Sequence, residues 1–205
     1  MNLNNCSFRT NSAKYSGGSL YFNSLENYII EKCNFINNSL FNDFNSTEGG
    51  SIFFNQCRSN KIVDCKFINN SVTSNFESFG GAISFFCKKI ESKIELKKCE
   101  FENNFISSLS GLNAFGGAVY AEGTSNILNC EFTNNIVSSL NKKINEFAGA
   151  LYLQNGEIND CNFNNNEAFN GCDIMCSIQF KSDLSIINCN FLHNSIQNRP
   201  IKSLI

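Results

Sequence analysis

Proline, histidine and arginine are scarce in this chain, and each scarcity excludes a class of structure or chemistry. The single proline, Pro200, lies close to the C-terminus, so asparagine and glycine must form the turns. The single histidine, His193, leaves the rest of the sequence without a Ser-His-Asp or Cys-His arrangement. Three arginines and a net charge of −2 provide no basic stripe, so we expect no nucleic-acid partner.

Long apolar runs are also missing. No stretch approaches the roughly 20 apolar residues that cross a bilayer as a helix, so we expect no transmembrane segment in this chain. Residues 1–5 have neither a basic start nor an apolar core, so we expect no secretory signal peptide.

Two short motifs alternate along most of the sequence. One is Cys-x-Phe-x-x-Asn, and the other is Gly-Gly followed by Ser or Ala and an aliphatic residue. The first motif begins at Cys6, Cys33, Cys65, Cys99, Cys130, Cys161 and Cys189. The second begins at Gly17, Gly49, Gly80 and Gly116, with a fifth copy at Ala148 that has lost one glycine and a decayed sixth at Gly171. The cysteines are 27, 32, 34, 31, 31 and 28 residues apart, and such a period predicts stacked repeats.

The repeats predict an all-β, right-handed parallel β-helix of about seven coils with roughly 31 residues per coil. Each repeat offers two short strands, because both motifs lie in β-branched and aromatic segments bounded by Asn or Gly. Equivalent side chains then lie about 4.8 Å apart on successive coils. The motif Phe residues form an internal stack, the Cys residues a ladder of buried thiols, and the last Asn residues a hydrogen-bonded amide ladder.

We interpret residues 1–205 as a single β-helix domain, either a fragment of a longer solenoid or a chain that stacks end to end. A leucine-rich repeat is the alternative, because the segment from Ile62 to Val72 also fits its consensus. Against it, most of the repeats exceed the 20–29 residues of that class, and a Gly-Gly strand stands where its leucines would be.

The alternation of Phe-x-x-Asn with Gly-Gly-Ala-[Ile/Leu/Val] resembles the repeats of chlamydial polymorphic outer-membrane proteins. It is also similar to β-helix surface proteins of protists. The resemblance runs from about residue 3 to residue 196. It implies a pectin-lyase-like β-helix with a surface or adhesive role, although this chain lacks the signal peptide and membrane-barrel segment of the chlamydial proteins.

Four cysteines lie outside the repeated column. Cys57 and Cys87 follow their glycine corners at similar distances, so a disulfide between adjacent coils stays open. Cys172 and Cys176 lack the second pair that a zinc site requires, and their disulfide state also stays open. We expect no metal and no cofactor.

One outer face carries charges, because alternate side chains of a strand point away from the core. The residues beside the motif cysteines include Asp64, Lys66, Lys98, Glu100 and Glu131. Glycoside hydrolases use a pair of carboxyl groups, and here two stacked carboxylates lie beside a basic residue. The patch is therefore a weak candidate for polysaccharide binding or cleavage. Ordinary cross-strand ion pairs are the stronger interpretation, so we assign no catalytic residue.

A column after the glycine corners contains aromatic rings. Its aromatic members are Tyr21, Phe53, Tyr120 and Tyr152. If the column faces outward, these rings form a stripe suited to stacking on sugars, and if it faces inward they belong to the core. His193 occupies a column of asparagines, so we interpret it as an asparagine substitute at a turn.

The leading functional hypothesis is a non-enzymatic structural or adhesive segment of a cell-surface or secreted protein. Its partner would be a protein or glycan at the cell surface, bound by the variable loops at residues 39–48, 71–79, 105–115 and 136–147. One alternative is a polysaccharide lyase, a hydrolase or a glycan-binding module of the pectin-lyase-like class. A further alternative is an intracellular interaction solenoid, which the missing signal and unpaired cysteines favour.

Overall fold

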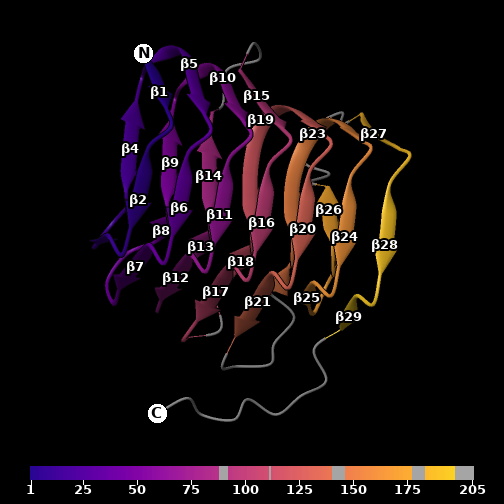
Figure 1. The fold of residues 1–205 in the computed structure, drawn as a ribbon. Helices are drawn as coiled ribbons and strands as arrows, with labels where there is room; N and C mark the ends of the chain where they lie inside the picture. Colours follow the sequence, from indigo (N-terminus) through magenta and orange to yellow (C-terminus); the bar gives the residue numbers. More distant parts are fainter. Residues whose placement is uncertain (88–91, 111, 140–145, 177–182, 197–205) are drawn as a thin grey trace.

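The computed structural model describes residues 1–87, 92–110, 112–139, 146–176 and 183–196, and it confirms a parallel β-solenoid. All paired strands run parallel, and equivalent residues of successive coils lie in register. Figure 1 shows the coils following one another from the N-terminal strands in indigo to β28 (Asn190–Leu192) in yellow. The described residues contain no helix, which favours the β-helix over the leucine-rich repeat.

The Cys-x-Phe-x-x-Asn motif forms sheet B, in which the motif Phe is the central residue of each short strand. Sheet B consists of β2 (Ser7–Arg9), β6 (Asn34–Ile36), β11 (Lys66–Ile68), β16 (Glu100–Glu102), β20 (Glu131–Thr133), β24 (Asn162–Asn164) and β28. Its seven strands follow the order of the seven motif copies, so each coil contributes one strand.

Sheet A contains the strands on either side of the turn that separates one repeat from the next. Before the motif lie β1 (Asn2–Asn4), β5 (Glu26–Glu31), β10 (Arg58–Val63), β15 (Lys93–Lys97) and β27 (Leu184–Ile187). After the glycine corner lie β4 (Leu20–Asn23), β9 (Ile52–Asn55), β14 (Ile83–Phe86) and β26 (Ile174–Cys176). β19 (Val119–Leu128) and β23 (Leu151–Asn159) run through both halves and join them into one sheet.

The variable segments are more ordered than the sequence predicted. Instead of loops, they begin with strands of sheet C and end with strands of sheet D, so two strands per repeat was too few. Sheet C consists of β3 (Ser12–Ala13), β7 (Ser39–Asn42), β12 (Ser71–Ser74), β17 (Phe105–Ser108), β21 (Ile136–Ser139), β25 (Glu167–Ala168) and β29 (Ser195–Ile196). Sheet D consists of β8 (Thr47–Glu48), β13 (Ser78–Phe79), β18 (Ala114–Phe115) and β22 (Glu146–Phe147). Leu40, Val72, Ile106 and Val137 form a second small core beneath them.

The main core lies between sheets A and B. The motif Phe rings stack with centroids 4.8 Å apart from Phe35 to Phe67 and 4.9 Å from Phe67 to Phe101, with nearly parallel planes. Burial of each such ring contributes about 2–3 kcal/mol relative to an exposed one. The predicted aromatic stack is therefore confirmed as the axis of the fold.

The two glycines of each corner have different roles. The first adopts a positive φ, as at Gly49 with φ +70°. The second has no room for a side chain, because a Cβ on Gly50 would lie 2.0 Å from the carbonyl oxygen of Gly81 on the next coil. Ala148 keeps the first position at φ +60°, where an L-residue is strained.

Candidate functional site

The charged patch predicted from the sequence is divided between a strand column and a turn. Lys66, Glu100 and Glu131 lie in register on the outer face of β11, β16 and β20. Nζ of Lys66 donates to Oε2 of Glu100 at 2.5 Å, and this contact raises the pKa of the lysine. Both side chains reach solvent, so the pair contributes at most about 1 kcal/mol.

The structure places Asp64 and Lys98 in turns beside this strand column and not on the strands of sheet B. Both precede a motif cysteine in the left-handed region, with φ of +51° and +53°. The backbone turns there so that the strand of sheet A ends and the next inward side chain, Cys65 or Cys99, enters the core. Asp64 and Lys98 therefore form an exposed corner beside the charged column.

The aromatic column faces away from the main core, yet most of its rings are covered. The neighbouring residues Phe54 and Phe85 are the ones in the core. Tyr21 is 52% exposed, whereas Phe53 is 7% and Tyr120 6% exposed. An open ring face of the kind that stacks on a sugar is thus present at Tyr21 and absent at Phe53 and Tyr120.

The cover comes from the ends of sheet D. The Tyr120 ring contacts Phe79 at a centroid distance of 4.9 Å, and the half-buried Tyr152 contacts Phe115 at 4.8 Å. Phe79 and Phe115 themselves stack at 5.3 Å. Phe79 and Phe115 precede the glycine corners, and together with Tyr120 and Tyr152 they form an outer aromatic cluster. The sequence pattern did not predict this cluster, because the turn at Gly-Gly brings together rings from either side of it.

Two shallow hollows lie on the outer face of sheet A, where the sequence predicted no site. The first, of about 280 Å³, lies against β5, β10 and β15, and the second, of about 580 Å³, lies against β15, β19, β23 and the chain at β27. Lys93 lines both of them. We call this surface the hollowed face, and its polar members include Asn27, Ser59, Lys61, Glu95, Asn126 and Glu157.

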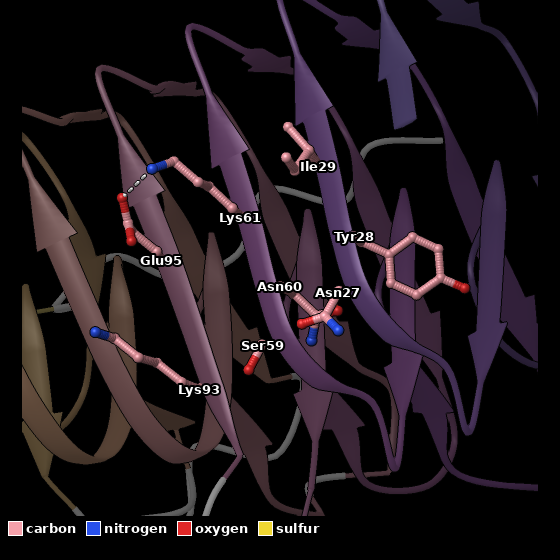
Figure 2. A pocket seen from close by; sticks show the side chains of 8 residues that line it. All are labelled: Asn27, Tyr28, Ile29, Ser59, Asn60, Lys61, Lys93 and Glu95. Carbon is pink, nitrogen blue, oxygen red and sulfur yellow. Dashed lines mark ion pairs between the residues drawn. The ribbon is translucent and has the colours of Figure 1, made fainter. Parts of the chain in front are cut away.

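An ion pair crosses the first hollow. Nζ of Lys61 lies 2.9 Å from Oε1 of Glu95 on the next strand, as the dashed line in Figure 2 marks. The same outward column continues through Asn126 and Glu157, which are in register with Glu95. The residue type changes from coil to coil, so no repeated motif indicated this column.

Buried polar groups lie on the same strands. Asn60 is 2% exposed and lines the first hollow, and within the described part of the chain neither atom of its amide has a hydrogen-bond partner. The hydroxyl of Tyr28, its neighbour on β5, is likewise without a partner there. Groups of this kind are normally paired with ordered water in native proteins.

No protein-family model matches this chain, and no curated protein and no solved structure matches it either. The resemblance to chlamydial and protist surface repeats therefore stays a prediction. Within the described ranges, no helix is long and apolar enough to cross a membrane.

The motif cysteines are thiols, and those in the interior coils are buried. Burial raises the pKa of Cys33 to about 11 and that of Cys130 to about 12, so these thiols stay protonated and unreactive near neutral pH. Cys57 and Cys87 are also buried thiols, and the Cys87 sulfur lies 2.6 Å from the Ser92 hydroxyl. The structure therefore has no disulfide between Cys57 and Cys87.

The two remaining off-column cysteines, Cys172 and Cys176, are half-buried near the last glycine corner. The sulfur of Cys176 lies 3.3 Å from the carbonyl oxygen of Gln154. Across the described ranges, no three His, Cys, Asp or Glu residues are close enough to hold a metal ion. His193 adopts φ +55°, like the asparagines of its column, which agrees with its interpretation as an asparagine substitute at a turn.

Apolar side chains project from sheet C and from its connections to sheet D. We call these residues the apolar rim, and its members are Phe41 on β7 and Phe44, Phe76 and Leu112 on the connections. Phe44 is the most exposed of the four side chains, at 72%. The strands that precede these connections pair in register, so the rim runs across three successive coils.

Proposed function

We propose that this chain is a non-enzymatic scaffold of a cell-surface or secreted protein, and that its apolar rim binds a protein partner. The observation that carries the proposal is the exposure of Phe41, Phe44, Phe76 and Leu112 on adjacent coils. Contiguous exposed apolar side chains are uncommon on soluble surfaces and mark interaction sites. Aromatic anchors supply much of the affinity of protein interfaces.

Hydrogen bonds between the connections support this role, because they hold the rim in place. The side-chain amide of Asn75 donates to Oδ1 of Asp43 at 3.1 Å, and the amide of Asn113 donates to Oε1 of Glu77 at 2.7 Å. The hydroxyls of Thr47 and Ser78 lie 3.3 Å apart at the start of sheet D. A surface ordered before binding loses less conformational entropy when the partner arrives.

The test is binding of fluorescently labelled chain to intact cells of the organism that encodes it. We expect saturable binding that falls at least tenfold in the double variant Phe44→Ser and Phe76→Ser. The matched control is Leu25→Ser, which removes an exposed apolar side chain from the connection between β4 and β5 and leaves the apolar rim intact. Equal binding by the double variant and the parent chain would contradict the proposal.

Carbohydrate binding at the hollowed face is the second candidate. It is favoured by the two hollows, whose amides, hydroxyls and the Lys61–Glu95 pair offer donors and acceptors to a polar ligand. Isothermal titration against neutral and acidic polysaccharides tests it, with Lys93→Met and Glu157→Gln as variants of the hollowed face and Lys98→Met as a control. Binding that the first two variants weaken and the control retains would move the function to this face.

We expect no cleavage of those polysaccharides. Glu100 and Glu131 stand side by side on parallel strands and extend in the same direction, whereas the two carboxyl groups of a glycosidase flank the scissile bond. The measurement follows new reducing ends and unsaturated products, with and without calcium. Turnover that disappears in Glu100→Gln or Glu131→Gln would make the charged column an active site.

A further inference from the structure

The same set of contacts joins every coil to the next. Between the second and third motif copies, the backbone N–H groups of Lys32 and Asn37 donate to the carbonyls of Val63 and Ile68, each at 3.0 Å. In the opposite direction, Lys66 N–H donates to the carbonyl of Cys33 at 3.0 Å. The equivalent bonds recur at all six junctions between motif copies, so this is one interface repeated six times.

The asparagine ladder belongs to the same interface. The backbone N–H of Asn38 donates to Oδ1 of Asn70 at 3.1 Å, and Ser71 N–H donates to the carbonyl of Asn38 at 2.9 Å. Both contacts are also found at the other five junctions, from Asn11 with Asn38 to Asn166 with Asn194.

Applied to the terminal coils, this pattern shows which groups each end offers. The last described coil presents the backbone N–H groups of Asn188, His193 and Asn194 and the carbonyls of Cys189 and Asn194. The first coil presents the carbonyls of Asn4 and Arg9, Oδ1 of Asn11, and the N–H groups of Ser7 and Ser12. In the described part of the chain these groups face no further coil. Each donor of one end corresponds to an acceptor of the other.

The apolar side chains of the two ends correspond as well. Ile186 is 46% exposed, although Ile158, its equivalent one coil earlier, is fully buried. Phe191 is likewise 46% exposed, whereas Phe163 is fully buried. On the first coil, Leu3, Cys6 and Phe8 occupy the equivalent positions and are only partly buried. In the interior coils, the equivalent apolar side chains are covered by the coils on both sides.

We propose that the coil of β27, β28 and β29 binds the coil of β1, β2 and β3 of a second copy of this chain, head to tail. The occupant is a second copy because its first coil carries Leu, Cys, Phe and Asn in the matching register and is only partly buried, whereas the equivalent residues of the interior coils are covered by described coils on both sides. Arg9 is the one charged side chain on the three N-terminal strands, and residues 184–195 contain no Lys, Arg, Asp or Glu, so no like charges meet. This contact is independent of the apolar rim.

The geometry gives an open assembly. The two surfaces in contact are different, so one copy leaves a free surface at each end, and repeated addition makes a filament rather than a closed dimer. Each added coil extends the stack by about 4.8 Å, so one copy of seven coils adds about 34 Å along the axis.

Sedimentation velocity and negative-stain electron microscopy of the full chain over a concentration series test the proposal. We expect a size that rises with concentration and unbranched filaments at the highest concentration. The variants Leu3→Lys and Ile186→Lys each place a charge in one end surface, and each alone should be monomeric. Mixed together they should form a one-to-one dimer and nothing larger, because only one intact surface of each kind remains.

Circular dichroism of each variant verifies that the solenoid is folded, and Phe44→Lys is the matched control on the apolar rim, which should assemble like the parent chain. A parent chain that stays monomeric at every concentration would overturn the proposal. So would folded variants that assemble alone, a mixture that forms filaments, or loss of assembly in Phe44→Lys, since that would place the contact at the rim.

Discussion

The side-chain oxygen of Asn70 accepts two hydrogen bonds from Asn38, one from the backbone N–H at 3.1 Å and one from the side-chain amide at 3.0 Å. The amide of Asn70 in turn donates to the carbonyl of Phe35 and to Oδ1 of Asn104, each at 3.0 Å. Each asparagine therefore holds three coils together with one planar side chain. Only a residue with both a donor and an acceptor on a short stem completes this pattern.

Replacement of Asn70 tests the ladder. In Asn70→Ala the backbone N–H of Asn38 loses its acceptor in a fully buried site, and the Asn38 amide and the Phe35 carbonyl each lose one hydrogen bond. An unsatisfied buried group costs about 1–3 kcal/mol and each lost hydrogen bond about 1 kcal/mol, so we expect a loss of about 3 kcal/mol in the free energy of unfolding. Urea denaturation followed by circular dichroism measures it. The control Asn45→Ala, on an exposed connection, should change stability by less than about 0.5 kcal/mol.

Ala148 offers a stabilising change at the fifth corner. It occupies the position of the first glycine at φ +60°, in a conformation that costs an L-residue roughly 1–2 kcal/mol. Ala148→Gly should therefore raise the free energy of unfolding by about 1 kcal/mol, measured as a shift in the urea midpoint at constant slope. The reverse substitution Gly116→Ala, at φ +70°, should lower it. A destabilised Ala148→Gly would mean that the buried methyl group contributes more than the strain removes.

Columns that repeat one residue type were predictable from the sequence. The motif Phe, Cys and Asn residues and the glycine corners recur with the same chemistry in each coil, so stacking determines their surroundings. Sheets C and D were not predicted, because no residue type is common to all of their strands. The strands of sheet C share only an alternation of buried and more exposed side chains, in which Leu40 and Val72 take equivalent buried positions.

The candidate sites depend on features that a strand pattern does not contain. Asp64 follows the alternation of β10 in the sequence, but its positive φ places it in a turn. The cover over Tyr120 comes from Phe79, which precedes the previous glycine corner and reaches it only through stacking of coils. Lys61, Glu95 and Asn126 share a column without sharing a residue type, so the hollowed face emerges only in three dimensions.

The thiol ladder predicts selective protection from alkylation. Cys33, Cys65, Cys99, Cys130 and Cys161 are all buried. Their thiols are inaccessible, and burial keeps Cys33 and Cys130 protonated, so iodoacetamide at pH 7.5 should leave these five unmodified in the folded chain. The half-buried cysteines, Cys6, Cys172, Cys176 and Cys189, should react first. Peptide mass spectrometry over time reads each site, and the urea-unfolded chain, in which every cysteine should react, is the control.

The last prediction concerns pH, because two carboxyl groups are removed from water near the C-terminal coils. Burial raises the pKa of Glu146 from 4.5 to about 7, with the charge of Glu167 adding to the effect. Burial also raises the pKa of Asp173 from 3.8 to about 6, although hydrogen bonds from Asn166 and Asn194 oppose the shift. Both groups thus bind protons more tightly in the folded chain than in the unfolded one.

A raised carboxyl pKa stabilises the fold at low pH and loses that contribution as the pH rises through the folded value. The free energy of unfolding should therefore fall between about pH 4.5 and 7, by up to about 3 kcal/mol for Glu146 alone, since each pKa unit corresponds to 1.36 kcal/mol. Urea titrations at several pH values measure the slope. Glu146→Gln keeps the shape and removes the charge, so its slope should be shallower and its stability at pH 8 higher than that of the parent chain. An unchanged slope in Glu146→Gln would show that the carboxyl group of Glu146 reaches water in the folded state.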